Sequence, residues 1–233
     1  MTKAPTTAPI FYDLITKDGA ALSPWCWHAR MAFAHKGITP EIIPLPFTQK
    51  DQVIAAGGKS FPLMVEHDGR ISDDSKIICH RLEDIQPTPS LFPEGVPAYN
   101  FMHRYMQTIV FPTLVKIILQ DIPNVLDDAD RAYFIESREA RFGKTLAEVC
   151  AMRDEMRTTL STQLDPFRKA MAVGGFISGD APAMADYLLF GTLQWARVCS
   201  PYPLVEQDDA IAIWMETMLD LFDGLGRKTP AAR

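Results

Sequence analysis

Residues 22–30 read Leu-Ser-Pro-Trp-Cys-Trp-His-Ala-Arg, and the prediction of the first half of the chain depends on this stretch. Residues 10–15 before it predict a short strand, and the apolar pattern after it predicts a helix that ends near residues 35–37. Pro24 suits the first turn of that helix, because an N–H there has no intrahelical partner. Ser23 is then the N-cap, and its hydroxyl lies among unpaired N–H groups where the helix dipole favours negative charge. Two interpretations stay open: a plain cap, or a cap that also stabilises a bound thiolate.

The composition is that of a globular protein. The 233 residues are 47% hydrophobic and 22% charged, which suffices for a buried core. The net charge of −6 provides no basic stripe for nucleic acid and argues against docking on anionic membranes. The most apolar run, residues 109–119, contains Pro112 and Lys116 and is too short to span a bilayer. We therefore expect neither a nucleic-acid nor a membrane partner.

The cysteines and histidines carry no metal or disulfide signature. The four cysteines form no C-x-x-C pair and have no histidine at zinc spacing, which predicts reduced thiols and a cytoplasmic location. Residues 1–9 lack the apolar segment of a signal peptide and are predicted to be a loose tail. No H-x-x-x-H and no G-x-S-x-G motif occurs, so neither a metal site nor a hydrolase triad is expected.

Turn signals divide the first half into alternating strands and helices. After the first helix we expect an edge strand at 41–45 (it contains Pro44), a short helix at 49–56, and a strand at 61–66. The Asp68-Gly69 pair predicts a hairpin into a strand at 70–72, and a helix follows from 73–75. The predicted order is β-α-β-α-β-β-α, an α+β domain with a mixed sheet over residues 10–86.

A proline-rich linker over residues 87–97 separates this domain from a predicted all-α domain over 98–233. Helices are predicted at 98–120 with a kink at Pro112, at 128–173 as one or two helices divided at Gly143, at 183–198, and at 211–223.

This organisation resembles the cytosolic glutathione transferases over residues 10–226, and local motifs carry the resemblance. The residues 23–26 stand where thioredoxin-fold proteins have C-P-x-C, with serine in place of the first cysteine. Residues 60–62 (Ser-Phe-Pro) look like the family's bend with a cis proline, and residues 74–75 (Asp-Ser) are similar to its acid-serine pair at the third helix. The resemblance implies the glutathione transferase fold, a thioredoxin-like domain followed by a helical domain, and glutathione as co-substrate.

The same resemblance implies roles for individual residues. Ser23 is the predicted catalytic residue, which donates a hydrogen bond to the glutathione thiolate. Phe61 and Pro62 hold the cysteinyl part through the backbone, while Asp74 and Ser75 bind the γ-glutamyl ammonium and carboxylate. The glycyl carboxylate is assigned to Lys59, Gln49 or Lys50. Taken singly, Asp74-Ser75 also reads as a plain helix start and Lys59 as a solvated lysine.

Further motifs narrow the resemblance. The S-P-x-x-W pattern of residues 23–27 is similar to the bacterial β-etherase-type enzymes and their fungal relatives, as are the segments 136–139, 144–149, 164–168 and 222–227. This subgroup implies cleavage of a β-aryl ether in a small lignin-derived aromatic electrophile, and a homodimer. Residues 179–186 resemble the family's capping box, but Ala183 replaces the usual serine or threonine and leaves Asp186 alone, which predicts a weakened local structure.

The predicted electrophile pocket is formed by the loop at residues 16–22, by Trp25 and by one face of the long helix, for example Tyr99, Met102, Met106 and Val110. Aromatic and methionine side chains at this spacing also suit an ordinary core. Two rival functions stay open. Cys26, near a helix N-terminus, suits glutathione-dependent thiol exchange or deglutathionylation, although a packing role is its simpler interpretation. The fold also suits a non-catalytic protein that binds aromatic ligands.

Overall fold

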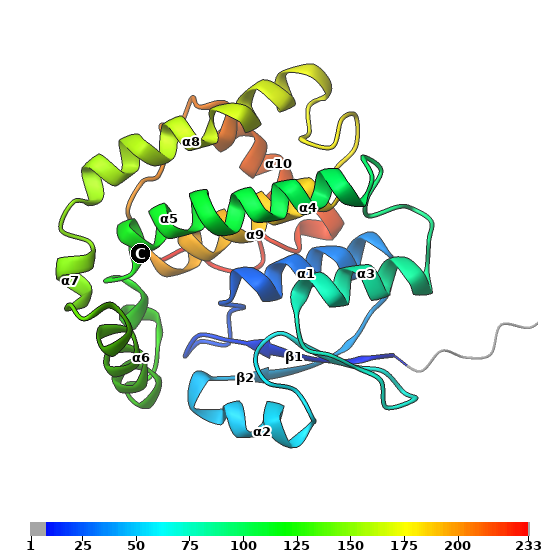
Figure 1. Cartoon of the computed structure of the whole chain (residues 1–233), viewed down its shortest axis with the longest axis horizontal. Helices are drawn as coiled ribbons and strands as arrows, with labels where there is room; N and C mark the ends of the chain where they lie inside the picture. The colour runs from blue at the N-terminus through cyan, green and yellow to red at the C-terminus, as the bar shows by residue number, and fades with distance from the viewer. Residues whose placement is uncertain (1–7, 233) are drawn as a thin grey trace, which may run out of the picture.

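A computed structural model describes residues 8–232, and most of the tail expected over residues 1–9 lies outside this range. The first half forms a sheet with helices, and the second half is helical (Figure 1). The elements of the first half are β1 (Ile10–Leu14), α1 (Pro24–His35), β2 (Glu41–Leu45), the 3-10 turn η1 (Phe47–Gln49), α2 (Lys50–Ala55), β3 (Leu63–Val65), β4 (Ile71–Ser72) and α3 (Ser75–Ile85). The predicted order and fold class are confirmed.

The four strands lie in the order β2-β1-β3-β4. β1 pairs in parallel with β2 and antiparallel with β3, which pairs antiparallel with β4. The strand with Pro44 lies at the edge, where a missing N–H costs no ladder bond. Gly69 has a φ of +82° in the β3–β4 turn, a conformation that glycine adopts without strain, so the predicted hairpin is also confirmed.

Helix α1 lies between the sheet and the helical half. Its Phe33 packs against Phe11 of β1 with ring centroids 5.3 Å apart. On the other side Trp27, which is fully buried, contacts Phe190 edge to face at 5.9 Å. A helix buried on both sides must be apolar nearly all round, and the apolar run after Pro24 meets this requirement. The position of the α1 N-terminus is therefore set by both halves.

The helical half contains more breaks than the sequence predicts. Its elements are α4 (Val96–Tyr105), the π-helical turn η2 (Met106–Val110), α5 (Phe111–Ile118), the 3-10 turn η3 (Ile122–Val125), α6 (Asp128–Phe142), α7 (Leu146–Val149), α8 (Arg153–Gly174), α9 (Met184–Cys199) and α10 (Ala210–Gly224). The expected kink at Pro112 is instead the π turn just before it, with the Phe111 N–H donating to the Met106 carbonyl. Gly143 ends α6 with a φ of +64°, and a second break before Arg153 makes three helices of the stretch predicted as one or two.

Asp186, together with a hydrogen bond from the Met184 N–H to the Leu91 carbonyl, holds the start of α9, which corrects the expected weakness there. Its fully buried carboxylate accepts hydrogen bonds from the N–H groups of Ile177, Ser178 and Ala183 at 2.8–3.2 Å, and from the Trp214 indole at 3.2 Å. Charge-assisted bonds of this kind are stronger than neutral ones. The side-chain cap that Ala183 cannot provide is thus offset by a carboxylate that binds the preceding loop and α10.

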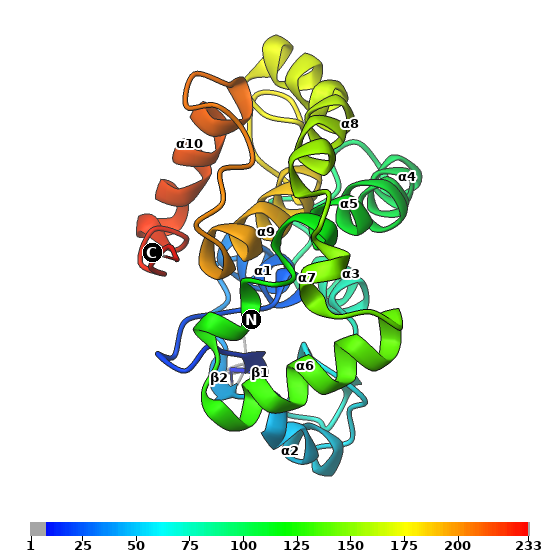
Figure 2. The same cartoon turned by 90° about the vertical axis from the view of Figure 1, so that its left-hand side faces the viewer.

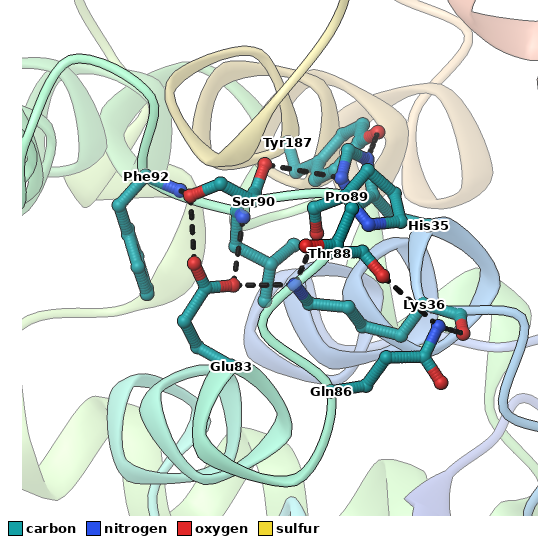
Figure 3. Close-up of polar contacts among 10 residues, drawn as sticks. His35, Lys36, Glu83, Gln86, Thr88, Pro89, Ser90, Phe92 and Tyr187 are labelled. Carbon is teal, nitrogen blue, oxygen red and sulfur yellow. Dashed lines mark hydrogen bonds and ion pairs between the residues drawn. The ribbon is translucent and has the colours of Figure 1, made fainter.

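The segment between α3 and α4 is fastened to the C-terminal end of α1 (Figure 3). The Lys36 side chain is fully buried, and its ammonium donates to Glu83 and to the Pro89 carbonyl. Glu83 also accepts from the Ser90 hydroxyl at 2.6 Å and from the Leu91 N–H at 2.8 Å. These bonds make the junction a fixed connection; the exact domain boundaries stay a prediction. Within residues 8–232, no helix is both long and apolar enough to cross a membrane.

Candidate active site

Ser23 caps α1 as predicted. It is 5% exposed, its backbone is extended, and its Oγ accepts a hydrogen bond from the Cys26 N–H at 3.5 Å. This distance is at the long limit for a hydrogen bond. Among the described residues the hydroxyl proton has no acceptor. The hydroxyl is therefore free to donate to a ligand at the positive end of the α1 dipole.

A cavity of about 490 Å³ opens beside this hydroxyl. Ser23 and Trp25 come from the start of α1, and Ser60 and Phe61 from the segment before β3. The rest of the lining comes from the end of β1, the α2 region, α5, η3, α6 and α9. Those walls carry the aromatic side chains Phe47, Phe111, Tyr133, Phe134, Phe142 and Trp195. Phe111 lies between Trp25 and Trp195, with its ring centroid 5.2 Å from each. A flat aromatic molecule fits these rings.

The bend before β3 lies next to Ser23 at this cavity. The Phe61-Pro62 peptide bond is cis, as predicted. Phe61 is half-buried and precedes the paired residues of β3, whose register with β1 begins at Leu63. Its backbone is thus outside the ladder, in a position suited to an extended peptide. The binding role predicted for Phe61 and Pro62 stays a prediction.

Of the other predicted glutathione contacts, one lies in the cavity lining and the others do not. Lys50 is in its lining, whereas Gln49 and Lys59 are exposed and outside it. Asp74 caps α3 and accepts from the N–H groups of Lys76 and Ile77, and the buried Ser75 is the first residue of that helix; neither is in the lining. The pair therefore begins a helix, and its ligand role stays a prediction.

Of the residues predicted to contact the electrophile, Trp25 and Leu22, the last residue of the 16–22 loop, lie in the cavity lining, and the predicted residues of the long helix do not. Tyr99 is 1% exposed and packs against Phe92 and two histidines, Met106 is 2% exposed, and Met102 lies on the same helical stretch outside the lining. The π turn lies between these residues and the turn that does face the cavity, which carries Phe111 and Val115. The residues on α6 and α9 were missed because no local motif marks them.

Cys26 lies next to Ser23 in a different environment. Its side chain is fully buried and outside the cavity lining. Burial, and after it the charge of Asp13, raises the pKa of the Cys26 thiol well above its ordinary value. A thiol that stays protonated is a poor nucleophile. Among residues 8–232, no group of three or more histidine, cysteine or carboxylate side chains is placed to hold a metal ion.

Comparisons with known proteins agree with this geometry. Residues 22–85 match the model of the glutathione S-transferase N-terminal domain, and residues 99–219 match that of the C-terminal domain. The glutathione S-transferase-like protein ustS of Aspergillus flavus is 27% identical over 84% of this chain and 83% of its own length. Glutaredoxin 2 of Escherichia coli is 25% identical over 77% of this chain and 87% of its own.

Solved structures share the fold. The glutathione transferase GSTFuA3 of Phanerochaete chrysosporium superimposes with a TM-score of 0.74 at 21% identity, over 96% of this chain and 95% of its own. CsGST63524 of Ceriporiopsis subvermispora, solved in complex with glutathione, gives 0.71 at 21% identity, again over 96% and 95%. None of these matches singles out the β-etherase-type subgroup, which stays a prediction. The two domain models together nevertheless establish that the chain belongs to the glutathione S-transferase family.

Proposed function

We propose that this protein transfers the glutathione thiolate to an electrophilic aromatic substrate, with cleavage of a β-aryl ether. The observation that carries the proposal is the Ser23 hydroxyl, which has a free proton at the N-terminus of α1 and borders an aromatic cavity. Glutathione as co-substrate follows from membership of the family.

The first requirement is an ionised thiol. A cysteinyl thiol has a reference pKa of about 8.5, so only a few per cent is thiolate at neutral pH. A hydrogen bond from the Ser23 hydroxyl and the dipole of α1 both favour the anion. Lowering the pKa by one unit requires ~1.4 kcal/mol of differential stabilisation, and we expect a lowering of one to two units. Ser23 keeps its oxygen out of the bond-forming step.

The second requirement is a positioned electrophile. In a β-aryl ether ketone, the thiolate attacks the carbon beside the carbonyl, the carbon–sulfur bond forms, and the carbon–oxygen bond breaks. The phenolate leaves with the electron pair and takes a proton from water. The rings around Phe111 suit both aromatic parts of such a molecule, and positioning within the cavity contributes much of the rate.

A panel of β-aryl ether ketones and haloaromatics, incubated with glutathione and read by mass spectrometry, tests the proposal. We expect a glutathione thioether and, from the ethers, an equal amount of free phenol. Retention on glutathione resin with no product from any member would indicate the non-catalytic aromatic-binding alternative. Products from the haloaromatics alone would support glutathione transfer and contradict cleavage of a β-aryl ether.

Membership of the family also leads us to propose a homodimer. Light scattering coupled to size-exclusion chromatography should give twice the 26.1 kDa chain mass. A single-chain mass at the concentration of the assay would contradict it.

A further inference from the structure

The cavity carries positive charge that the chain itself does not neutralise. Lys50 of α2 and Arg138 and Arg141 of α6 line it, and no aspartate or glutamate does. The chain as a whole has a net charge of −6. An acidic protein has thus gathered cationic side chains around one hollow, which favours an anionic ligand there.

Arg138 differs in its ion pairing from several arginines elsewhere in the molecule. Arg81, Arg153 and Arg168 each form an ion pair with a carboxylate at 2.5–2.7 Å. Arg138 has no carboxylate within 4.0 Å among the described residues. Its guanidinium instead donates to the Ser137 hydroxyl at 2.9 Å.

Aromatic rings hold this guanidinium in place. Its central carbon lies 4.7 Å from the ring centroid of Phe134 and 5.6 Å from that of Phe47. Stacking fixes the plane of the group and leaves its edge, with the N–H donors, available. A planar fork of this kind is suited to binding a carboxylate through two parallel hydrogen bonds.

The surroundings also favour an added anion. Burial lowers the pKa of Arg138; Tyr133 acts in the opposite direction and the neighbouring charge of Arg141 in the same direction, and the net effect is a lowered pKa. A cation that is partly withdrawn from water beside a like charge gains when an anion approaches. The nearby Asp130 carboxylate is already occupied, because it accepts from the N–H groups of Phe47 and Thr48 at 2.7 and 2.8 Å.

The same bonds of Asp130 fix α6 against the sheet half. Figures 1 and 2 both show α6 beside the end of the sheet near α2. The cavity lining therefore combines Ser23, Phe61 and Lys50, where glutathione is expected, with Arg138 of α6.

We propose that the electrophile is an aromatic acid, whose ring carboxylate binds Arg138 while its reacting carbon faces the thiolate at Ser23. Arg138 is then the residue that determines this specificity, and Arg141 adds to the positive potential. The inference rests on the proposed function and deepens it, because it names the class of substrate.

Two matched substrates test it: 4-chloro-3-nitrobenzoate and 4-chloro-3-nitrobenzamide, which lose the same chloride and differ in one charge. At saturating glutathione, kcat/KM for each is divided by its uncatalysed rate with glutathione. We expect the wild-type protein to prefer the benzoate, and Arg138→Met to reduce that preference roughly tenfold or more. Methionine keeps an apolar chain against Phe134, and Arg138→Lys, which keeps the charge without the fork, should retain part of the preference.

Arg104→Met serves as the matched control, because Arg104 is exposed on α4 and outside the cavity lining. It should leave the preference unchanged. The inference is overturned if Arg138→Met raises the KM for glutathione with the benzamide and leaves the benzoate preference intact, since Arg138 would then hold glutathione itself.

A binding measurement separates this inference from the proposed function. If neither substrate reacts, the transferase proposal fails, and calorimetry with unreactive S-methylglutathione present still decides the question. Tighter binding of the benzoate than of the benzamide, lost in Arg138→Met, supports the carboxylate site. Equal binding of the two in the wild-type protein overturns it.

Discussion

The two ends of helix α1 are built in opposite ways. At its start, the Ser23 hydroxyl accepts one long hydrogen bond and keeps its proton free beside a cavity. At its end, the Lys36 ammonium is fully buried, with Glu83 and the Pro89 carbonyl as partners, and its own carbonyl accepts from Gln86 at 2.7 Å (Figure 3). The N-terminal end thus keeps a free hydrogen-bond donor, and we call it the open end. At the C-terminal end the polar groups described have partners, and we call it the saturated end.

The bonds at the saturated end hold α1 in place and thereby fix the position of Ser23 at the open end. His35, one residue before Lys36, is hydrogen-bonded to the Tyr187 hydroxyl at 2.8 Å and to the Ser90 carbonyl at 3.1 Å. These bonds fix α1 against α9 and against the segment that joins the two halves. A reactive group on a rigid element needs few bonds of its own to hold its position. Polar bonds along α1, such as those of Trp27 to the Ala21 carbonyl and of Arg30 to Asp13, also hold the helix in place and leave the Ser23 hydroxyl proton available.

The largest effect is expected at the saturated end. Lys36→Met leaves the half-buried Glu83 carboxylate without its cation, and because this carboxylate keeps the Ser90 and Leu91 donors, the loss should be about 2–3 kcal/mol of unfolding free energy. Urea denaturation measures the loss. Turnover per folded molecule should be kept, because Lys36 is outside the cavity lining. The exposed Lys116→Met is the control, and equal stability of the two variants would show that this end is not the energetic lock.

The next effect is expected at the open end. Ser23→Ala removes the proposed donor and leaves the α1 dipole, so the pKa of bound glutathione should rise by about one unit and kcat/KM below pH 7 should fall roughly tenfold. Ultraviolet absorbance of the bound thiolate, titrated with pH, gives the pKa directly. Loss of the cap should cost only about 1 kcal/mol of stability. Ser23→Thr keeps the hydroxyl and should retain most activity; an alanine variant with unchanged turnover and unchanged thiol ionisation would disprove the mechanism.

Between the two ends, His28 faces α9 and makes folding sensitive to acid. Its Nε2 is 3.1 Å from the Leu188 carbonyl, and burial, and after it the proximity of His103, lowers the pKa of His28 to about 3. The unfolded value is about 6.5, so below that pH the unfolded chain binds a proton that the folded chain does not. The contribution of His28 to the free energy of unfolding is therefore fully present above about pH 6.5 and is lost as the pH is lowered. At pH 5 the loss is about 2 kcal/mol.

The contribution of His28 is isolated by substitution. His28→Gln keeps a donor for the Leu188 carbonyl and should flatten the loss of unfolding free energy between pH 7 and pH 5. The exposed His67→Gln should follow the wild-type curve. If unfolding free energy depended on pH identically in the wild type and in His28→Gln, the acid sensitivity would have to come from residues other than His28.

The sequence predicts the open end of α1 far better than what surrounds it. The cap at Ser23 and the cis bond before Pro62 were predicted because each is marked by adjacent residues, one by a serine-proline pair and the other by a family motif. Phe111, Trp195 and Arg138 were missed, because the cavity brings them together from three helices separated by many residues. Their lining roles follow from how α5, α6 and α9 pack, which no local pattern contains.

The sequence analysis also missed the buried Lys36–Glu83 ion pair at the C-terminal end of α1, for the same reason. Nothing next to Lys36 in the sequence indicates that its ammonium is buried, since its partners Glu83 and Pro89 are about fifty residues away. The start of α9 shows the converse: the local pattern predicted weakness, and Asp186 compensates through bonds to the preceding loop and to Trp214. Contacts distant in sequence therefore decide both whether a charge is paired and whether a helix end is stable.

The smallest effect is expected at Cys26, one turn into α1 from Ser23. Its thiol is the rival nucleophile, yet burial and the charge of Asp13 keep it protonated and it lies outside the cavity lining. Cys26→Ala should therefore change kcat/KM less than twofold, while a modest loss of stability follows from the smaller side chain in a packed site. Assays of glutathione transfer and of deglutathionylation on the same preparation distinguish the two chemistries. If Cys26→Ala abolished either activity while Ser23→Ala did not, the reacting end of the helix would be its buried thiol, and the comparison between an open and a saturated end would no longer describe the site.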